Sequence, residues 1–163
     1  MLGWGKKDFM IEVASDGDLR DIERIHAASF PRGWSQSELL DMHNNDGTLV
    51  LVARPVGMKN VRVAGFNIFR QTQIEAEIIS VAVDPKWRRQ GIGDLLMRDA
   101  MRRLSGNRIP VLFLEVSEAN HHAIALYRRL GFATVGTRPA YYREGAEEDG
   151  KPAAALVMRA ALD

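Results

Sequence analysis

The chain has 163 residues, of which 46% are hydrophobic and 26% are charged, and its formal net charge is +1. This length and mix are typical of one soluble globular domain, and they exclude the concentrated basic face of a nucleic-acid-binding protein. The absence of cysteine excludes disulfides, thiolate metal sites, iron–sulfur clusters and a cysteinyl acyl-enzyme. With no apolar run long enough to cross a bilayer and no secretory signal, we expect a cytoplasmic protein without a membrane or direct nucleic-acid partner.

The chain shows no internal repeat and no linker, so we predict a loose tail over residues 1–7 and a single domain over residues 8–163. Apolar periodicity and capping signals place the elements in a mixed α/β order around a central sheet. They are a strand over Phe9–Ala14, a helix opened by Asp16-Gly17-Asp18, a loop over Phe30–Trp34, a helix begun by the capping box Ser35–Glu38, strands over Thr48–Ala53, Val61–Arg70 and Gln73–Val83, a helix over Ile92–Leu104, a strand over Val111–Val116, a helix over Asn120–Leu130, and strands over Ala133–Arg138 and Ala154–Arg159.

The most informative stretch is Val83–Asp94, which joins a predicted apolar strand to a predicted amphipathic helix. Gly91 and Gly93 lack a Cβ atom, so their backbone can take positive φ and approach a ligand closely. The helix that begins there leaves free N–H groups and the positive end of its dipole pointing outward. Together these features predict a cradle for an anion such as pyrophosphate, with the charges of Arg88 and Arg89 at its rim.

Other phosphate-binding loops differ from this stretch. A Walker loop places Lys-Ser or Lys-Thr after its last glycine, whereas Asp94-Leu95 follows here, so that alternative fails. The dinucleotide fingerprint needs a third Gly or Ala where Leu96 stands, and it needs the glycines directly after the strand. Glu115 nevertheless ends the next strand, where a ribose-binding acid would sit. A dinucleotide-binding module therefore stays open, as does a turn that serves only packing.

The motifs around this turn resemble those of a known family. Val81–Pro85 and Arg89–Gly93 are similar to the acetyl-coenzyme A motif of the GCN5-related N-acetyltransferase (GNAT) superfamily. The second half of the chain agrees through Leu114–Val116, Asn120, Ala123–Tyr127, Gly131–Phe132, Arg138 and Tyr141-Tyr142. Within the superfamily, this series is similar to the bacterial ribosomal-protein-alanine N-acetyltransferases, over a match from about Ala76 to Met158.

The resemblance implies a fold, a cosubstrate and a set of binding residues. The fold would be a mixed α/β sheet of about seven strands with flanking helices, and acetyl-CoA would enter a V-shaped split between two parallel strands. By position, Val81, Ala82 and Val83 would offer backbone partners to the acetyl group and the pantetheine, Arg89, Gln90, Gly91, Ile92, Gly93 and Asp94 would hold the pyrophosphate, and Asn120 would contact the cofactor.

One carboxylate is the expected general base. Glu115 matches the base of the subfamily, and it is the only charge in the apolar strand Val111–Val116, where partial loss of water would strengthen it as a base. The alternative is a carboxylate at the rim that pairs with an arginine such as Arg128. Glu75 and Glu77, on the strand that leads to the carbonyl-binding residues, are rival bases that would act through water.

Aromatic and histidine residues complete the expectations. Tyr127 matches the general acid of the subfamily, although its place on an apolar helix face also suits an ordinary core aromatic. Trp34, Tyr141 and Tyr142 lie in predicted loops, where they either line an acceptor groove or fill the core. The histidines have no metal-ligand spacing, so we expect surface or cap residues and no metal site: His26, His43, His121 and His122.

These expectations amount to direct acetyl transfer, without an acyl-enzyme, from acetyl-CoA to a protein N-terminal amine. By resemblance, the acceptor is the N-terminal alanine of a small-subunit ribosomal protein. Two positions depart from the subfamily: Arg32-Gly33 interrupts a Phe-Pro-Trp sequence, and Ala154 stands where an acidic residue is common. An acetyltransferase for another peptide or a small amine therefore stays open, and so does a non-catalytic coenzyme sensor.

Overall fold

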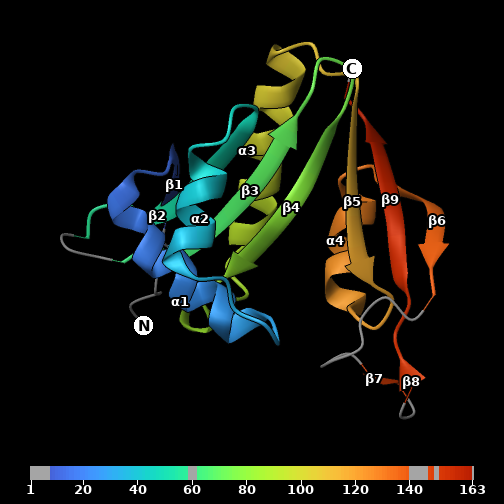
Figure 1. Cartoon of the computed structure of the whole chain (residues 1–163), viewed down its shortest axis with the longest axis horizontal. Coiled ribbons are helices and arrows are strands. Elements are labelled where there is room, and N and C mark those ends of the chain that lie inside the picture. Colours follow the sequence, from blue (N-terminus) through green and yellow to red (C-terminus); the bar gives the residue numbers. More distant parts are fainter. Residues whose placement is uncertain (1–7, 59–61, 140–146, 149–150, 163) are drawn as a thin grey trace, which may run out of the picture. The chain divides into compact units, whose positions relative to one another are not determined.

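A computed structural model describes residues 8–58, 62–139, 147–148 and 151–162 (Figure 1). Seven strands form a mixed sheet in the order β1-β2-β3-β4-β5-β9-β6, and β7 pairs with β8 separately. The strands are β1 (Phe9–Val13), β2 (Thr48–Pro55), β3 (Gly65–Gln71), β4 (Ala76–Val83), β5 (Val111–Ser117), β6 (Ala133–Arg138), β7 (Glu147–Glu148), β8 (Lys151–Pro152) and β9 (Ala155–Ala161). The helices are α1 (Leu19–Ser29), α2 (Gln36–His43), α3 (Ile92–Gly106) and α4 (His121–Arg129), with short 3-10 turns at Asp16–Asp18 and Pro85–Trp87. The predicted α/β fold with about seven sheet strands is confirmed.

Contacts within the chain group its residues into two compact units. The first unit comprises Met1–Ile68 and Ser80–Ala100, and the second comprises Phe69–Ile79 and Met101–Asp163. The predicted phosphate-binding turn therefore belongs to the first unit, and Glu115 belongs to the second. None of the helices in the described part of the chain is long and apolar enough to span a bilayer.

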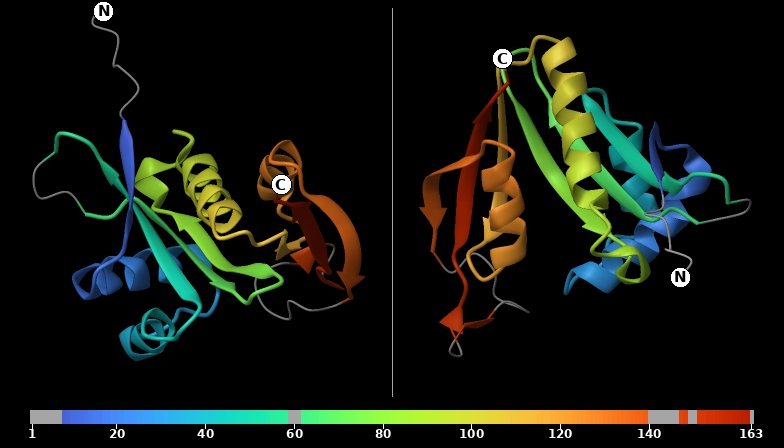
Figure 2. Two further views of the ribbon diagram at one scale, coloured as in Figure 1. Left: turned by 90° about the horizontal axis from the view of Figure 1, so that it is seen from above. Right: turned by 180° about the vertical axis from the view of Figure 1, so that it is seen from behind.

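In the first unit, helices cover both faces of the strands. Figures 1 and 2 show α1 and α2 on one face of β2 and β3, with the first turns of α3 on the opposite face. Leu19, Ile22 and Ile25 recur at helical spacing along α1, and all three are buried. Because both faces are covered, the middle of β2 and the start of β3 are buried, and these runs are apolar apart from Asn67.

In the second unit, the strands are buried mainly on one face. Leu112, Leu114 and Val116 of β5 are buried, whereas the residues between them are partly exposed. Figure 2 shows α4 lying along one face of β5 and β9. β9 pairs antiparallel with both β5 and β6, and the starts of β4 and β5 pair in parallel. The half-exposed face of β5 carries Glu115.

The start of β3 differs from the prediction. The strand begins at Gly65 and not at Val61, which itself lies outside the described residues. Before the strand, the Val63 N–H donates to Asp21 Oδ2 at 3.0 Å. The Val63 N–H is thus bonded to a carboxylate in the first turn of α1, and the strand begins two residues later.

The start of β4 also lies later than predicted. It begins at Ala76 and not at Gln73, because a tight turn occupies the preceding residues. The Thr72 N–H donates to the Glu75 carbonyl at 2.8 Å, and the Glu75 N–H donates to Thr72 Oγ1 at 3.2 Å. Two short strands that were not predicted from the sequence, β7 and β8, lie in the segment before β9.

Candidate functional site

The predicted phosphate-binding turn leads directly into α3. Arg89 and Gly91 have φ values of 65° and 78°, and the Leu95 N–H donates to the Gly91 carbonyl at 3.1 Å. That bond makes Gly91 the residue at which the helix starts, so the next three N–H groups have no acceptor within the helix. Gly93 lies in the first turn of α3 and, contrary to expectation, does not take positive φ.

Asp84, directly after β4, anchors the segment that precedes the turn. Its side chain is buried, with Oδ1 accepting from the Lys86 N–H at 3.0 Å and Oδ2 accepting from Arg24 Nη1 at 2.6 Å. Burial alone would raise the pKa of Asp84, but the Lys86 hydrogen bond and the Arg24 guanidinium outweigh it and lower the pKa below 3.8. The ionised carboxylate therefore ties α1 to the approach to the turn.

A glycine lets α3 lie close to the sheet beneath the turn. A Cβ atom on Gly65 would lie 3.0 Å from the Ala82 carbonyl oxygen and 3.2 Å from side-chain atoms of Ile92 and Leu96. These distances are shorter than ordinary carbon contacts, so a larger residue at this position would push α3 away. β3 and β4 thereby fix where the open N–H groups of α3 begin.

The predicted backbone partners lie at the end of β4. Ala82 is buried, and Val81 and Val83 are partly exposed. The Val83 carbonyl accepts a hydrogen bond from Arg88 Nε at 3.3 Å. In the helix, Asp94 pairs with Arg98 at 2.8 Å across one turn, as an exposed polar face predicts. These residues, the turn and the helix start all belong to the first unit, and the open amides with a left-handed Gly91 fit a phosphate group.

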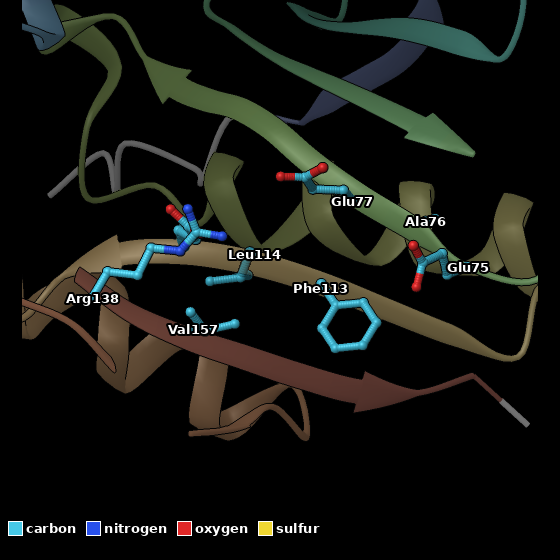
Figure 3. A pocket seen from close by; sticks show the side chains of 8 residues that line it. Glu75, Ala76, Glu77, Phe113, Leu114, Arg138 and Val157 are labelled. Carbon is cyan, nitrogen blue, oxygen red and sulfur yellow. The ribbon is translucent and has the colours of Figure 1, made fainter. Parts of the chain in front are cut away.

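A pocket lies on the second unit. It is lined by residues of β4, β5, β6 and β9 and the residue before β4: Glu75, Ala76, Glu77, Phe113, Leu114, Glu115, Arg138 and Val157. Figure 3 shows the Glu75 carboxylate at one end, Arg138 at the other, and the Phe113 ring and the Val157 side chain between them. The structure therefore brings the predicted base and both of its rivals to one pocket, with an apolar floor between charged ends.

Glu115 has an arginine partner, though not the one named from the sequence. Arg138 Nε lies 2.8 Å from Glu115 Oε1, and the two side chains are 59% and 21% exposed. The suggested pairing with Arg128 was wrong, because Arg128 lies on the exposed side of α4 whereas Arg138 extends from β6 into the pocket. The carboxylate is thus partly shielded from water and beside a positive charge.

Tyr127 and Asn120 both belong to α4 or its cap. Tyr127 is 7% exposed, and its ring centroid lies 5.8 Å from that of Phe132. Asn120 precedes the helix, where its Oδ1 accepts from the Ala123 N–H at 3.2 Å, and its side chain is exposed. Asn120 is therefore a helix cap in this structure, and the Tyr127 ring packs as a core aromatic does.

His26 corrects the prediction that the histidines are surface or cap residues. It is 3% exposed, its ring stacks on Trp34 at a centroid distance of 4.1 Å, and its Nδ1 accepts from the Trp34 N–H at 3.2 Å. Burial lowers the pKa of His26 below 6.5, although the charge of Glu38 opposes the shift. The half-buried Trp34 therefore holds the loop after α1 against the helix. Tyr141 and Tyr142 lie outside the described residues.

Two functional candidates were missed in the sequence. Arg138 was quoted only as part of a motif, and Arg24 was not considered. Arg138 pairs with the predicted base Glu115, and Arg24 pairs with Asp84, the residue after the predicted backbone partner Val83. Their partners lie 23 and 60 residues away along the chain, so no local pattern could reveal them. Within the described residues, no group of three or more His, Asp or Glu side chains could hold a metal ion.

Comparisons of the sequence and of the structure with known proteins find acetyltransferases in each case. The model of the acetyltransferase (GNAT) family matches residues 19–132. The chain is 38% identical over 120 residues to the Escherichia coli (strain K12) ribosomal protein bS18-alanine N-acetyltransferase, covering 74% of this chain and 75% of that protein. The crystal structure of the ribosomal-protein-S18-alanine N-acetyltransferase from Escherichia coli superposes with a TM-score of 0.82 at 28% identity, over 96% of this chain and 95% of that one.

A third comparison concerns the fold alone. The structure of yncA from Salmonella typhimurium, determined with its cofactor acetyl-CoA, superposes with a TM-score of 0.78 at 22% identity. The match covers 95% of this chain and 94% of that one, so the two chains share a fold over nearly their whole length.

Proposed function

The chain belongs to the acetyltransferase (GNAT) family, and from this premise we propose that it moves an acetyl group from acetyl-CoA directly to the N-terminal α-amine of a protein. Membership confirms the resemblance seen in the sequence and the prediction of an N-acetyltransferase. The observation that carries the finer proposal is Glu115, a partly shielded carboxylate on the wall of a pocket, with its arginine at 2.8 Å.

The turn before α3 is the part of the chain suited to hold the coenzyme. We assign Arg89, Gln90, Gly91, Ile92, Gly93 and Asp94 to the pyrophosphate, because the first N–H groups of a helix and its dipole favour a negative group. Val81, Ala82 and Val83 are assigned to the pantetheine and the acetyl group, and Asn120 to the cofactor. Acetyl-CoA supplies the thioester whose carbonyl carbon the amine attacks.

The expected acceptor follows from proton chemistry. An α-amine has a pKa of about 7.7–8.0, so a substantial fraction is neutral near neutral pH, whereas a lysine with a pKa of about 10.4 is almost wholly protonated. A single carboxylate can therefore serve an α-amine but is poorly matched to lysine. One shielded glutamate in an otherwise apolar strand fits the first task.

Two side chains move the protons in this proposal. As the amine nitrogen bonds to the thioester carbon and the carbon–sulfur bond breaks, Glu115 accepts the proton that the nitrogen loses. Tyr127 then gives its hydroxyl proton to the departing thiolate. Glu75 and Glu77 line the same pocket, so a water held by either is the alternative route for the first proton.

For the acceptor itself, we propose the N-terminal alanine of a ribosomal protein, because the relative at 38% identity is named for that activity on bS18. Trp34, Tyr141 and Tyr142 are assigned to the acceptor side. Arg32-Gly33 and Ala154 depart from the subfamily pattern, so they are positions at which the acceptor can differ. In the structure, Ala154 donates its N–H to Glu118 Oε1 at 3.2 Å. Acetylation of another peptide or a small amine is the second candidate.

The proposal is tested by offering the purified chain acetyl-CoA with a panel of peptides. The panel holds the bS18 N-terminus, unrelated N-termini, and N-terminally blocked peptides that contain lysine. Fragment mass spectrometry should place the acetyl group on the α-amine of alanine. Label on lysine alone would overturn the acceptor class, and binding of coenzyme A without any turnover would favour a sensor. Tighter calorimetric binding of NAD than of coenzyme A would favour the dinucleotide-binding alternative.

A further inference from the structure

The pairing of Glu115 with Arg138 spans a strand that lies between them. In the sheet, β9 separates β5 from β6, so the two residues project from strands that are not neighbours. Adjacent strands lie about 4.8 Å apart, which places the two backbones about 10 Å apart across β9. Only two long side chains that lean toward each other close that distance to the observed 2.8 Å.

The register of β9 shows that both side chains are on one face. Glu115 pairs with Val157, and Arg138 pairs with Ala155. Because side chains of a strand alternate, Val157 and Ala155 point to the same face, and their partners point with them. That face is the one on which the pocket lies, since Glu115, Arg138 and Val157 all line it.

A bulge in β6 puts Arg138 on this face. Ala133 pairs with Arg159 and Thr134 with Met158, but the register then shifts, so that Gly136 and not Val135 pairs with Val157. With regular alternation from Ala133, residue 138 would point to the opposite face, because a slip of one residue exchanges the two faces. Bulges of this kind often aim a side chain beside a functional site.

The ion pair leaves part of the carboxylate for a substrate. Within the described residues, Glu115 pairs with Arg138 through its Oε1 atom. An ion pair on one oxygen restrains the rotation of the carboxylate, while the second oxygen stays able to accept a proton. The guanidinium is the more exposed partner, at 59% against 21%.

We propose that Arg138 is a positioning residue that acts through Glu115: aimed by the β6 bulge, it holds one carboxylate oxygen so that the other faces the acceptor amine. The proposal rests on the function proposed above, in which Glu115 takes the amine proton. Arg138 itself need not touch either substrate, and its effect on transfer is exerted through the orientation of the base.

The test is a double-mutant cycle on the full chain. Arg138→Gln should lower kcat by about 10- to 100-fold, because a catalytic group displaced by about 1 Å loses a rate of this order. The KM for acetyl-CoA should stay unchanged. In the Glu115→Gln background the same change should have no further effect, because two residues that act as one unit are not additive. Arg128→Gln, which removes an exposed arginine of the same unit, is the matched control and should match wild type.

Two rescue measurements separate positioning from a structural role. Arg138→Lys keeps the charge without the planar fork and should recover part of the rate. Guanidinium chloride, added far below the concentrations that unfold the chain, should speed Arg138→Gln and leave Arg128→Gln unchanged. Calorimetric binding of coenzyme A checks that each variant is folded. If Arg138→Gln does not fold, the kcat of Arg138→Lys is compared with wild type instead.

The outcomes distinguish this inference from the proposed function. If Glu115→Gln turns over like wild type, the assignment of the base fails. A slow Glu115→Gln beside an Arg138→Gln of normal rate overturns the positioning role alone. A further loss in the double variant, or a failure of both lysine and guanidinium to recover any rate, also overturns it, because Arg138 would then act independently of Glu115 or only through packing.

Discussion

The turn of the first unit and the pocket of the second are formed by different parts of the chain, the backbone and the side chains. The turn is made by the backbone, through the left-handed φ of Arg89 and Gly91 and the open amides of α3. The pocket is made by side chains of β4, β5, β6 and β9, and its charged groups come from positions 75 to 138 of the chain. A backbone site needs few residue types at fixed spacing, whereas a side-chain site depends on which strands pair and in which register.

This difference shows where each unit should be sensitive to mutation. Substitutions in the turn alter the backbone conformations that it can adopt, so they should change the affinity for the coenzyme. Changes in the pocket alter which groups can take or give a proton, so they should act on turnover with the fold intact.

The largest effect is expected at the proposed base. Glu115→Gln keeps the shape of the side chain but removes its ability to accept a proton, so turnover should fall by about 10²- to 10⁴-fold. Coenzyme A affinity, measured by calorimetry, should stay close to wild type. Glu75→Gln is the comparison variant from the same pocket. A large loss in Glu75→Gln with normal turnover in Glu115→Gln would transfer the role to the water-mediated route.

The next effect is expected at the proposed acid. Tyr127→Phe removes one hydroxyl and retains the ring that packs 5.8 Å from Phe132, so the melting temperature should change little while transfer slows by about 10²-fold. Phe132→Leu is the reverse control, because it disturbs the same packing without removing a proton donor. Equal rates in Tyr127→Phe and wild type would leave Tyr127 as a core aromatic only.

A smaller effect is expected at the turn. Gly91→Ala should weaken coenzyme A binding by about 5- to 30-fold, because a residue with a Cβ atom costs about 1–2 kcal/mol in the left-handed conformation. A Cβ atom added at Gly91 or at Gly106 would meet no other part of the described chain within 4 Å, but only Gly91 has positive φ. Gly106→Ala is therefore the matched control and should bind like wild type. Equal affinity for both variants would contradict a backbone cradle at residues 89–94.

The same difference explains what the sequence could predict. The capping box at Ser35 forms as expected, with the Glu38 N–H donating to Ser35 Oγ at 3.2 Å and the Ser35 N–H to Glu38 Oε2 at 2.8 Å. The helix start after Gly91 was also predicted, because both signals lie within a few residues of their effect. The family was recognised through this turn and the motifs of the second half.

Features that depend on distant parts of the chain were not predictable. The partner of Glu115 was misassigned because a bulge in β6 decides the face of Arg138. Gly136, a glycine within the predicted strand, is a signal of such a bulge that was not used. His26 was misplaced because its burial depends on Trp34, eight residues later, folding back over the ring. In both cases tertiary packing overrides what neighbouring residues suggest.

The smallest effect concerns His26 and should appear as a pH dependence of stability in the first unit. Burial lowers the pKa of folded His26 below the 6.5 of an exposed histidine, so between these two values the unfolded chain binds more protons than the folded one. The contribution of His26 to the free energy of unfolding is therefore complete above the pKa that it has in the unfolded chain. It is lost as the pH falls through the pKa that it has in the folded chain. Asp84, whose pKa is lowered below 3.8, stays ionised in the upper part of this range.

Melting temperatures measured from about pH 7 down to about pH 5.5 should thus fall in wild type. His26→Asn can place an acceptor near the Trp34 N–H without a titrating ring, so its melting temperature should change less over the same range. His122→Asn, which alters an exposed histidine, should keep the slope of wild type. If His26→Asn is as sensitive to acid as wild type, the neutral ring is not what holds the loop after α1.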